Sequence, residues 1–306
     1  MSQERSLKRY IWLVDTIRRY QPITYAELEA KIVQSGQFDK GDIMFSERTF
    51  FRDANAIESI FGIVLFFDRK TKGYYIKEAQ SKEEQHMLDW MLHTFRHANV
   101  LEVYRDQAKH ILLEPPPKGN EHLSAILEGI RHDDILALAL KRFRTFKVVT
   151  IDIIPYFVRL FRQEWYLVAR DLKKDLVRIF PLDKIADITK TGEKFELPED
   201  EDYPEVATFF KDYFGVIMDE GASRETIRLR VSGDTAKQLQ LMPLHSSQVE
   251  VEATDGYTVL SVRLHPTPDF IQELCRYGNG LQVLSPASVK EKVVAFAQSI
   301  LDNYND

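Results

Sequence analysis

Apolar residues near the start of the chain recur at helical intervals and predict the first two helices. One covers residues 6–20, where cations such as Arg9 are expected at the surface, and Pro22 ends it. Thr24 is followed by Glu27 three residues later, which is the pattern of a capping box. A second helix is therefore expected to begin at Thr24.

The next segment predicts a third helix and a hairpin. Ser46 is a favourable N-cap and Gly62 a favourable end for this helix. Its apolar residues share one face of a helical wheel: Phe50, Ala54, Ile57 and Phe61. The runs 63–67 and 74–76 read as two strands around a turn rich in cations. Three helices followed by a basic hairpin predict a winged helix-turn-helix domain over residues 1–78.

The middle of the chain changes from a helical to a strand pattern. Residues 81–113 read as helical and end at the linker Pro115–Pro117, so we expect a helical linker over residues 79–121. A short helix is expected at 122–131. Closely spaced strands then predict a small β-barrel over residues 122–197. The expected strands are Ile135–Phe143, Phe146–Ile154, Phe157–Phe161, Trp165–Arg170, Leu176–Pro181 and Ile185–Thr189.

The last part of the chain predicts a separate α/β module. Residues 198–205 form an acidic connector flanked by prolines, and a helix is expected at 206–214. The following pattern alternates in the order β-α-β-β-α-β, which is typical of a ferredoxin-like fold, and a final helix is expected over Pro286–Tyr304. With residues 198–306 as this module, the whole chain is predicted to be an α+β multidomain protein.

Charge is distributed unevenly along the chain. The net charge is −6, yet residues 1–78 carry +2, residues 79–197 carry +1 and residues 198–306 carry −9. The acidity of the last part therefore leaves room for a DNA-binding surface near the N-terminus. The apolar runs are too short to span a bilayer, and Cys275 is the one cysteine, so we expect a cytoplasmic protein without disulfides or a cysteine-based zinc site.

The third helix carries residues suited to reading DNA. Ser46 would cap the helix, Arg48 and Thr49 would lie in its first turn, Arg52 would follow one turn later, and Asn55 would also face away from the core. The first turn of a recognition helix usually reaches the base edges, and an arginine fork can bind guanine or phosphate. Alternatively, this face is solvated and its cations pair with neighbouring acids such as Glu47 or Asp53.

The turn of the hairpin offers a second set of cations. Arg69, Lys70 and Lys72 would contact phosphates or the minor groove with little sequence discrimination. The alternative is an ordinary charged hairpin turn.

Cations and aromatic residues also alternate along the strands of the predicted barrel. Trp165 and Leu167 are expected in its core. Cations beside stacking surfaces on a small barrel suit a single-stranded nucleic acid or a nucleotide. The candidate ligand-binding residues are Tyr156, Arg159, Tyr166, Arg170, Arg178 and Lys184. For Arg178 the alternative is a structural ion pair with an acid such as Asp171 or Asp183.

Two segments resemble a known family. The run 154–170, with its Trp165-Tyr166-Leu167 tripeptide, and the run 177–185 resemble the signature of the WYL family. The pattern at 46–53 is similar to the recognition helices of winged-helix regulators that carry WYL modules. Arg178 matches an arginine of the signature, whereas Lys184 stands where a second arginine is usual.

The resemblance implies a ligand-responsive transcription regulator. The WYL module would be a small barrel of the Sm or SH3-like kind that holds a nucleic-acid or nucleotide ligand through basic residues. Because lysine lacks the bidentate fork of arginine, Lys184 puts the ligand preference at that position in doubt. The partners implied are double-stranded DNA, which two winged helices would bind as a homodimer, and that ligand.

Signals for enzymatic chemistry are poor. His93 and His97 have the spacing of a zinc site, but the catalytic glutamate of a metalloprotease is absent between them. No phosphate-binding Gly-Lys-Ser/Thr loop occurs, and we expect no cofactor, metal or enzymatic activity. Two alternatives to a regulator stay open: an accessory protein that holds single strands for a partner effector, and a hydrolase or nuclease.

Overall fold

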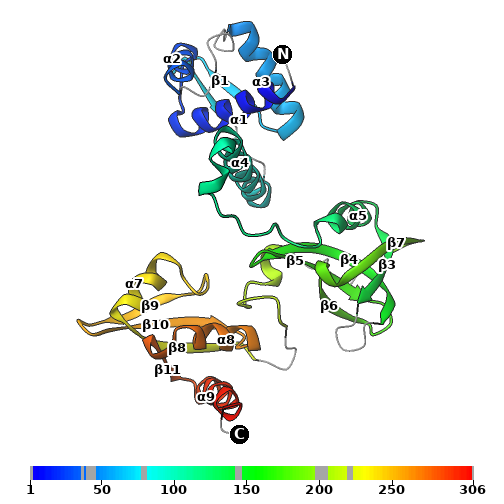
Figure 1. Cartoon of the computed structure of the whole chain (residues 1–306), viewed down its shortest axis with the longest axis vertical. Coiled ribbons are helices and arrows are strands. Elements are labelled where there is room, and N and C mark those ends of the chain that lie inside the picture. Colours follow the sequence, from blue (N-terminus) through cyan, green and yellow to red (C-terminus); the bar gives the residue numbers. More distant parts are fainter. Residues whose placement is uncertain are drawn as a thin grey trace. The chain divides into compact units, whose positions relative to one another are not determined.

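The chain forms two compact units, Met1–Glu114 and Pro115–Asp306, which are described separately (Figure 1). The structure is a computed structural model. It describes residues 3–35, 38, 46–76, 81–141, 147–196, 206–218 and 223–304. The acidic connector expected at 198–205 lies outside these residues.

The first unit begins with three helices and a two-stranded antiparallel hairpin, in the predicted order. They are α1 (Gln3–Tyr20), α2 (Tyr25–Ser35), α3 (Glu47–Phe61), β1 (Leu65–Asp68) and β2 (Gly73–Ile76). The capping box before α2 is confirmed, because Glu27 N donates to Thr24 Oγ1 over 3.3 Å and Thr24 N donates to the Glu27 carboxylate over 2.8 Å. Gly62 ends α3 in the left-handed region at φ 68°.

Helix α4 (Lys82–Val103) belongs to this first unit and is followed by a short helix η1 (Arg105–His110). Leu88 and Leu92 of α4 pack against the core that α1, α2, α3 and the hairpin share. Arg18 pairs with Asp89 over 2.5 Å across the same contact. The helical segment expected at 81–113 is therefore attached to the three-helix core by apolar packing and by charge.

Arg9 corrects one prediction, because it is buried. It is 2% exposed, and its guanidinium makes two hydrogen bonds to Asp53 of α3, which is fully buried. The cause is that α1 packs on more than one side: Ile11, Trp12, Leu13 and Val14 are all buried and point in different directions. A position opposite the apolar stripe of such a helix is also enclosed.

The second unit opens with a helix and a five-stranded antiparallel sheet. Its strand order is β6-β5-β4-β3-β7. The elements are α5 (Asn120–Arg131), β3 (Asp134–Lys141), β4 (Val148–Phe161), β5 (Glu164–Asp171), β6 (Leu176–Pro181), η2 (Leu182–Lys184) and β7 (Ile185–Lys194).

Strand β4 was predicted as two strands with a break at Pro155, and that prediction was wrong. The structure has one strand of 14 residues. The register to β5 shifts between Pro155 and Phe157, so Tyr156 is the extra residue of a β-bulge. The bulge accommodates a proline that has no N–H for the ladder.

Both faces of this sheet are buried against other elements. One face and α5 enclose a cluster that includes Ile126, Leu167 and Phe180. The other face forms a cluster around Phe157 and Val168, against which Phe209 and Phe210 pack. Phe209 ends the short helix α6 (Val206–Phe209), so the segment after the connector covers the second face.

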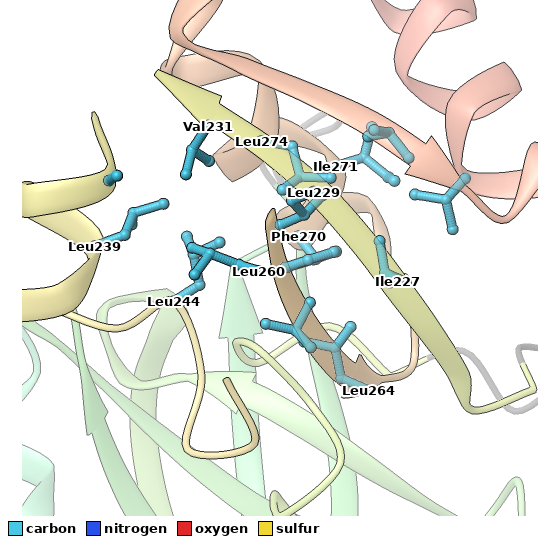
Figure 2. Close-up of a cluster of buried hydrophobic side chains, with 14 residues drawn as sticks. Ile227, Leu229, Val231, Leu239, Leu244, Leu260, Leu264, Phe270, Ile271 and Leu274 are labelled. Atoms are coloured by element: carbon cyan, nitrogen blue, oxygen red, sulfur yellow. The ribbon is translucent and has the colours of Figure 1, made fainter. Parts of the chain in front are cut away.

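A four-stranded antiparallel sheet follows in the order β11-β8-β10-β9. Its elements are β8 (Glu225–Ser232), α7 (Gly233–Leu241), β9 (Val249–Ala253), β10 (Tyr257–Leu264), α8 (Pro268–Arg276), η3 (Gly278–Gly280), β11 (Leu281–Ser285) and α9 (Ala287–Asp302). This is the predicted β-α-β-β-α-β order with a final helix. Figure 2 shows that Ile227, Leu229 and Val231 of β8 belong to one cluster with Leu239 of α7 and Phe270 of α8.

Candidate functional site

Helix α3 presents a polar surface opposite its buried face. Phe50 and Ile57 are in the core, whereas Arg48, Arg52 and Asn55 are exposed. The Ser46 hydroxyl accepts a hydrogen bond from Thr49 N over 3.2 Å, as expected of an N-cap. The cap therefore fixes the first turn from which Arg48 projects.

The ion pairs of α3 leave its outward cations largely available. Asp53, which could have paired with them, is held by the buried Arg9. Arg52 Nε lies 3.8 Å from Asp53 Oδ1 at the edge of that pair and is 58% exposed. Arg48 has no ion-pair partner among the described residues. Local pairing with Asp53 therefore engages Arg52 weakly, and the structure gives no such pairing for Arg48.

Asp68 organises the turn between β1 and β2. Its carboxylate accepts hydrogen bonds from Lys70 N over 2.9 Å and from Thr71 Oγ1 over 3.2 Å. The cations at positions 69, 70 and 72 are exposed and have no ion pair within the described part of the chain. The turn therefore presents three solvated cations, Arg69, Lys70 and Lys72, on a constrained backbone.

Phe51 is a candidate that the sequence reasoning passed over. Its ring is 53% exposed although its neighbour Phe50 is buried, and the two rings are 5.6 Å apart in an edge arrangement. A helical wheel predicts that Phe51 is exposed, because position 51 lies on the side of Asn55 and away from Ile57. An exposed aromatic ring beside Arg48 can make apolar contacts with thymine methyl groups.

The sheet of the second unit separates the residues expected to bind a ligand. Arg159 of β4 lies opposite Tyr166 of β5, and Arg170 has the same strand parity as Tyr166, so these three side chains share one face. Arg178 of β6 lies opposite Ala169 and projects from the other face. The predicted set does not converge on one surface.

Three of these cations already have partners. The Arg159 guanidinium donates to the Gly215 carbonyl over 2.7 Å and lies 3.9 Å from the centre of the Phe210 ring. Burial lowers the pKa of Arg159 from its ordinary value. Arg170 pairs with Asp175 over 2.7 Å, and Lys184 with Asp183 over 2.7 Å.

Arg178 adopts the alternative that the sequence left open, an ion pair with Asp171. Its guanidinium donates to Asp171 Oδ2 over 2.6 Å, and the carboxylate also accepts from the backbone amides of Lys173 and Lys174 over 3.0 Å. Burial alone would raise the pKa of Asp171, but these hydrogen bonds hold it below its usual value. The pair anchors the turn between β5 and β6.

The two tyrosines of the predicted set differ in accessibility. Tyr156 is 4% exposed and is part of the core cluster, so little of its ring can meet a ligand. Tyr166 is half-buried, and its hydroxyl donates to Glu164 over 2.5 Å. Burial and that carboxylate raise the pKa of Tyr166, so the phenol stays neutral.

Tyr166 lies in a cleft of about 540 Å³ on the sheet face that it shares with Arg159. Phe161, Arg162 and Pro181 form part of the wall, and Val216 and Asp269 close it from the C-terminal part of the unit. Arg162 pairs with Glu273 across the same junction. The cleft combines an aromatic wall with fixed charges of both signs.

Comparisons with known proteins define two domains in the second unit. Residues 121–190 match the model of the WYL domain, and residues 223–301 match the model of the WCX domain. The chain therefore carries a WYL domain followed by a WCX domain. No curated protein matches the sequence.

Two solved structures are similar to the chain. The proteasome accessory factor B/C (PafBC) of Arthrobacter aurescens is 17% identical with a TM-score of 0.37, over 98% of this chain and 46% of that one. A CRISPR Cas-related protein is 13% identical with a TM-score of 0.41, over 99% of this chain and 83% of that one. The chain thus spans about half the length of PafBC. No helix in the described segments is long and apolar enough to cross a membrane.

Proposed function

We propose that this protein is a DNA-binding transcription regulator whose first unit is a winged helix-turn-helix domain. In this proposal α3 is the recognition helix and the β1–β2 turn is the wing. The observation that carries the proposal is the Ser46-capped helix, which presents Arg48, Arg52 and Asn55 to solvent while Asp53 is occupied by Arg9. A row of exposed hydrogen-bonding side chains on the first turns of a helix suits the major groove.

In this proposal the second unit senses a ligand of the nucleic-acid or nucleotide kind. The WYL domain would be a small Sm-like barrel and the WCX domain a ferredoxin-like module. The cleft beside Tyr166 supports a ligand better than the separated cations do, because Arg170, Arg178 and Lys184 have acidic partners. A cytoplasmic homodimer would place two recognition helices on successive half-sites of a palindrome.

The test is sequence-specific binding of duplex DNA by the full-length protein. The probe is duplex from upstream of the protein's own gene, compared with random duplex at moderate salt. The wild type should prefer the former, and Arg48→Ala with Arg52→Ala should abolish the preference, since each bidentate base contact contributes about 1–3 kcal/mol of discrimination. Equal affinity of the wild type for both duplexes would refute a regulator.

A matched variant distinguishes recognition of the base sequence from contact with the phosphates. Replacing Arg69, Lys70 and Lys72 with alanine should weaken binding to both duplexes and lower the salt dependence, while the preference persists. If the hairpin variant loses the preference and the α3 variant keeps it, the assignment of the recognition helix is wrong.

A further inference from the structure

The WCX sheet has a second face that its core does not use. Ile227, Leu229 and Val231 of β8 point into the core on the side of α7 and α8 (Figure 2). Side chains alternate along a strand, so Arg228 and Arg230 project from the opposite face. They are exposed, whereas the helices that contribute to the core, α7, α8 and α9, pack with the side chains of the other face.

The neighbouring strand adds a third arginine to this open face. Arg263 of β10 lies opposite Thr226 of β8, two residues from the Ser261–Arg228 pair, and is exposed. The two central strands of the sheet therefore carry Arg228, Arg230 and Arg263 side by side, and we call these residues the arginine face. Within the described residues none of the three has an ion pair.

This concentration of charge contrasts with the surrounding sequence. Residues 198–306 contain 9 Lys and Arg against 18 Asp and Glu, yet three of those cations share one sheet face. Register places one acid, Glu252, on the described part of that face, and its carboxylate accepts a hydrogen bond from the Tyr257 hydroxyl over 3.2 Å. The face is thus locally basic within an acidic domain.

Groups that suit nucleic-acid bases surround the cations. The Arg230 guanidinium lies 4.7 Å from the centre of the half-buried Tyr257 ring, so a cation and an aromatic ring are adjacent on this face. Ser232 and Gln282 are exposed on the same face and offer hydrogen bonds. Arg228 and Arg230 are about 6.7 Å apart along the strand, a spacing that lets each bind a separate phosphate.

We propose that the arginine face binds single-stranded nucleic acid, with the three arginines on the phosphates and Tyr257 with Arg230 as a stacking surface. Charge complementarity favours an anionic chain, and the ring, hydroxyl and amide groups favour bases over an acidic protein segment. A sheet face can follow an extended single strand, whereas it does not enter the groove of a duplex as a helix does. This inference stands independently of duplex binding by α3.

The experiment measures binding of labelled oligothymidylate to the full-length protein as a function of salt. The test variant carries Arg228→Ala, Arg230→Ala and Arg263→Ala. The matched control carries Lys237→Ala, Arg276→Ala and Lys290→Ala, which remove the same charge from exposed helical positions of the same domain. Thermal unfolding of both variants should match that of the wild type, because all six side chains are exposed and Glu273, which pairs with Arg276 over 3.5 Å, keeps its pair with Arg162.

We expect the test variant to lose about tenfold or more in affinity, and its salt slope to fall by about 2, from three lost phosphate contacts at about 0.7 each. The control should remain within about twofold of the wild type, since it removes charge without a contact. The Arg48→Ala, Arg52→Ala variant should bind oligothymidylate normally. A failure of the proposal on duplex DNA can therefore be distinguished from a failure of the proposal on single strands.

Four outcomes would overturn the inference. They are a wild type that does not bind oligothymidylate, a control that loses as much affinity as the test variant, a loss of binding in Tyr166→Ala while the test variant binds normally, and polyglutamate displacing the oligonucleotide at equal charge concentration. The last result would assign the face to an acidic protein partner.

Discussion

Single residues show why charge alone does not identify a functional site. The sequence alone does not distinguish the roles of Arg9, Arg48 and Arg178. In the fold, Arg9 is a buried structural partner, Arg178 anchors a turn through Asp171, and Arg48 projects into solvent. Their acidic partners lie at different distances along the chain, 44 residues away for Arg9 and 7 for Arg178. Asp171 was one of two nearby acids that the sequence offered for Arg178, whereas no local pattern could have assigned a partner 44 residues away to Arg9.

The Arg9–Asp53 pair leads to a prediction about stability. Asp53→Asn should destabilise the first unit by about 3–5 kcal/mol, because it removes the negative charge of Asp53 from beside the buried guanidinium of Arg9. Urea unfolding, followed by circular dichroism of the full chain, measures the change. Asp255→Asn, at an exposed turn, serves as the control and should change stability by less than about 0.5 kcal/mol.

A double replacement tests whether the cost arises from the loss of the Asp53 charge beside Arg9. Arg9→Met with Asp53→Leu should recover much of the loss, because an apolar pair of similar size needs no counter-charge. If the double variant is as unstable as Asp53→Asn, the pair acts through geometry that carbon side chains cannot replace.

At the scale of elements, local patterns predicted most of the fold. Helix caps at Thr24 and Ser46 and the end at Gly62 lie where the sequence placed them. Two elements are exceptions. The helix expected at 206–214 forms only over α6, Val206–Phe209. Strand β4 continues through Pro155, because a proline inside an apolar run usually marks a boundary and a bulge is invisible without the partner strand. The strand register also decides which side chains share a face of the sheet. The sequence therefore could not show that Arg170 and Arg178 project from opposite faces.

Two glycines with left-handed backbones allow an element-scale prediction. Gly119, before α5, has φ 83°, and a Cβ there would lie 2.4 Å from Leu182 Cβ. Gly192 in β7 has φ 88° with open space around it. Gly192→Ala should cost about 1 kcal/mol in unfolding free energy from backbone strain alone. Gly119→Ala should cost about 1–3 kcal/mol more, because Leu182 and its backbone must move.

Thermal or urea unfolding of the two alanine variants measures this difference. Each variant is the control for the other, because both share the strain of a positive φ. Equal losses would show that the segment before α5 yields to the added methyl group and does not fix the position of η2.

At the scale of the whole molecule, the mixed α/β class could be predicted from local patterns, whereas the arginine face could not. The alternation of helix and strand patterns gave an α+β chain, and the division between the two units falls at Pro115, within the expected linker. The arginine face was not predicted, because Arg228, Arg230 and Arg263 come together only through the pairing of β8 with β10. In sequence they lie within the most acidic part of the chain.

A regulator of the proposed kind requires coupling between its two nucleic-acid surfaces. A ligand changes duplex affinity only if it binds one state of the protein better than another, and the effect is reciprocal. Saturating oligothymidylate should therefore change the affinity of the full-length protein for its upstream duplex by about 5–150-fold, and the duplex should change oligothymidylate affinity by the same factor. Fluorescence anisotropy with each probe in turn measures both factors.

The variant with alanine at Arg228, Arg230 and Arg263 should abolish this mutual effect while it retains binding of the duplex alone. A factor of one in both directions would mean that the surfaces act independently, and a response lost only in Tyr166→Ala would place the sensor at the cleft of the WYL domain and not at the arginine face.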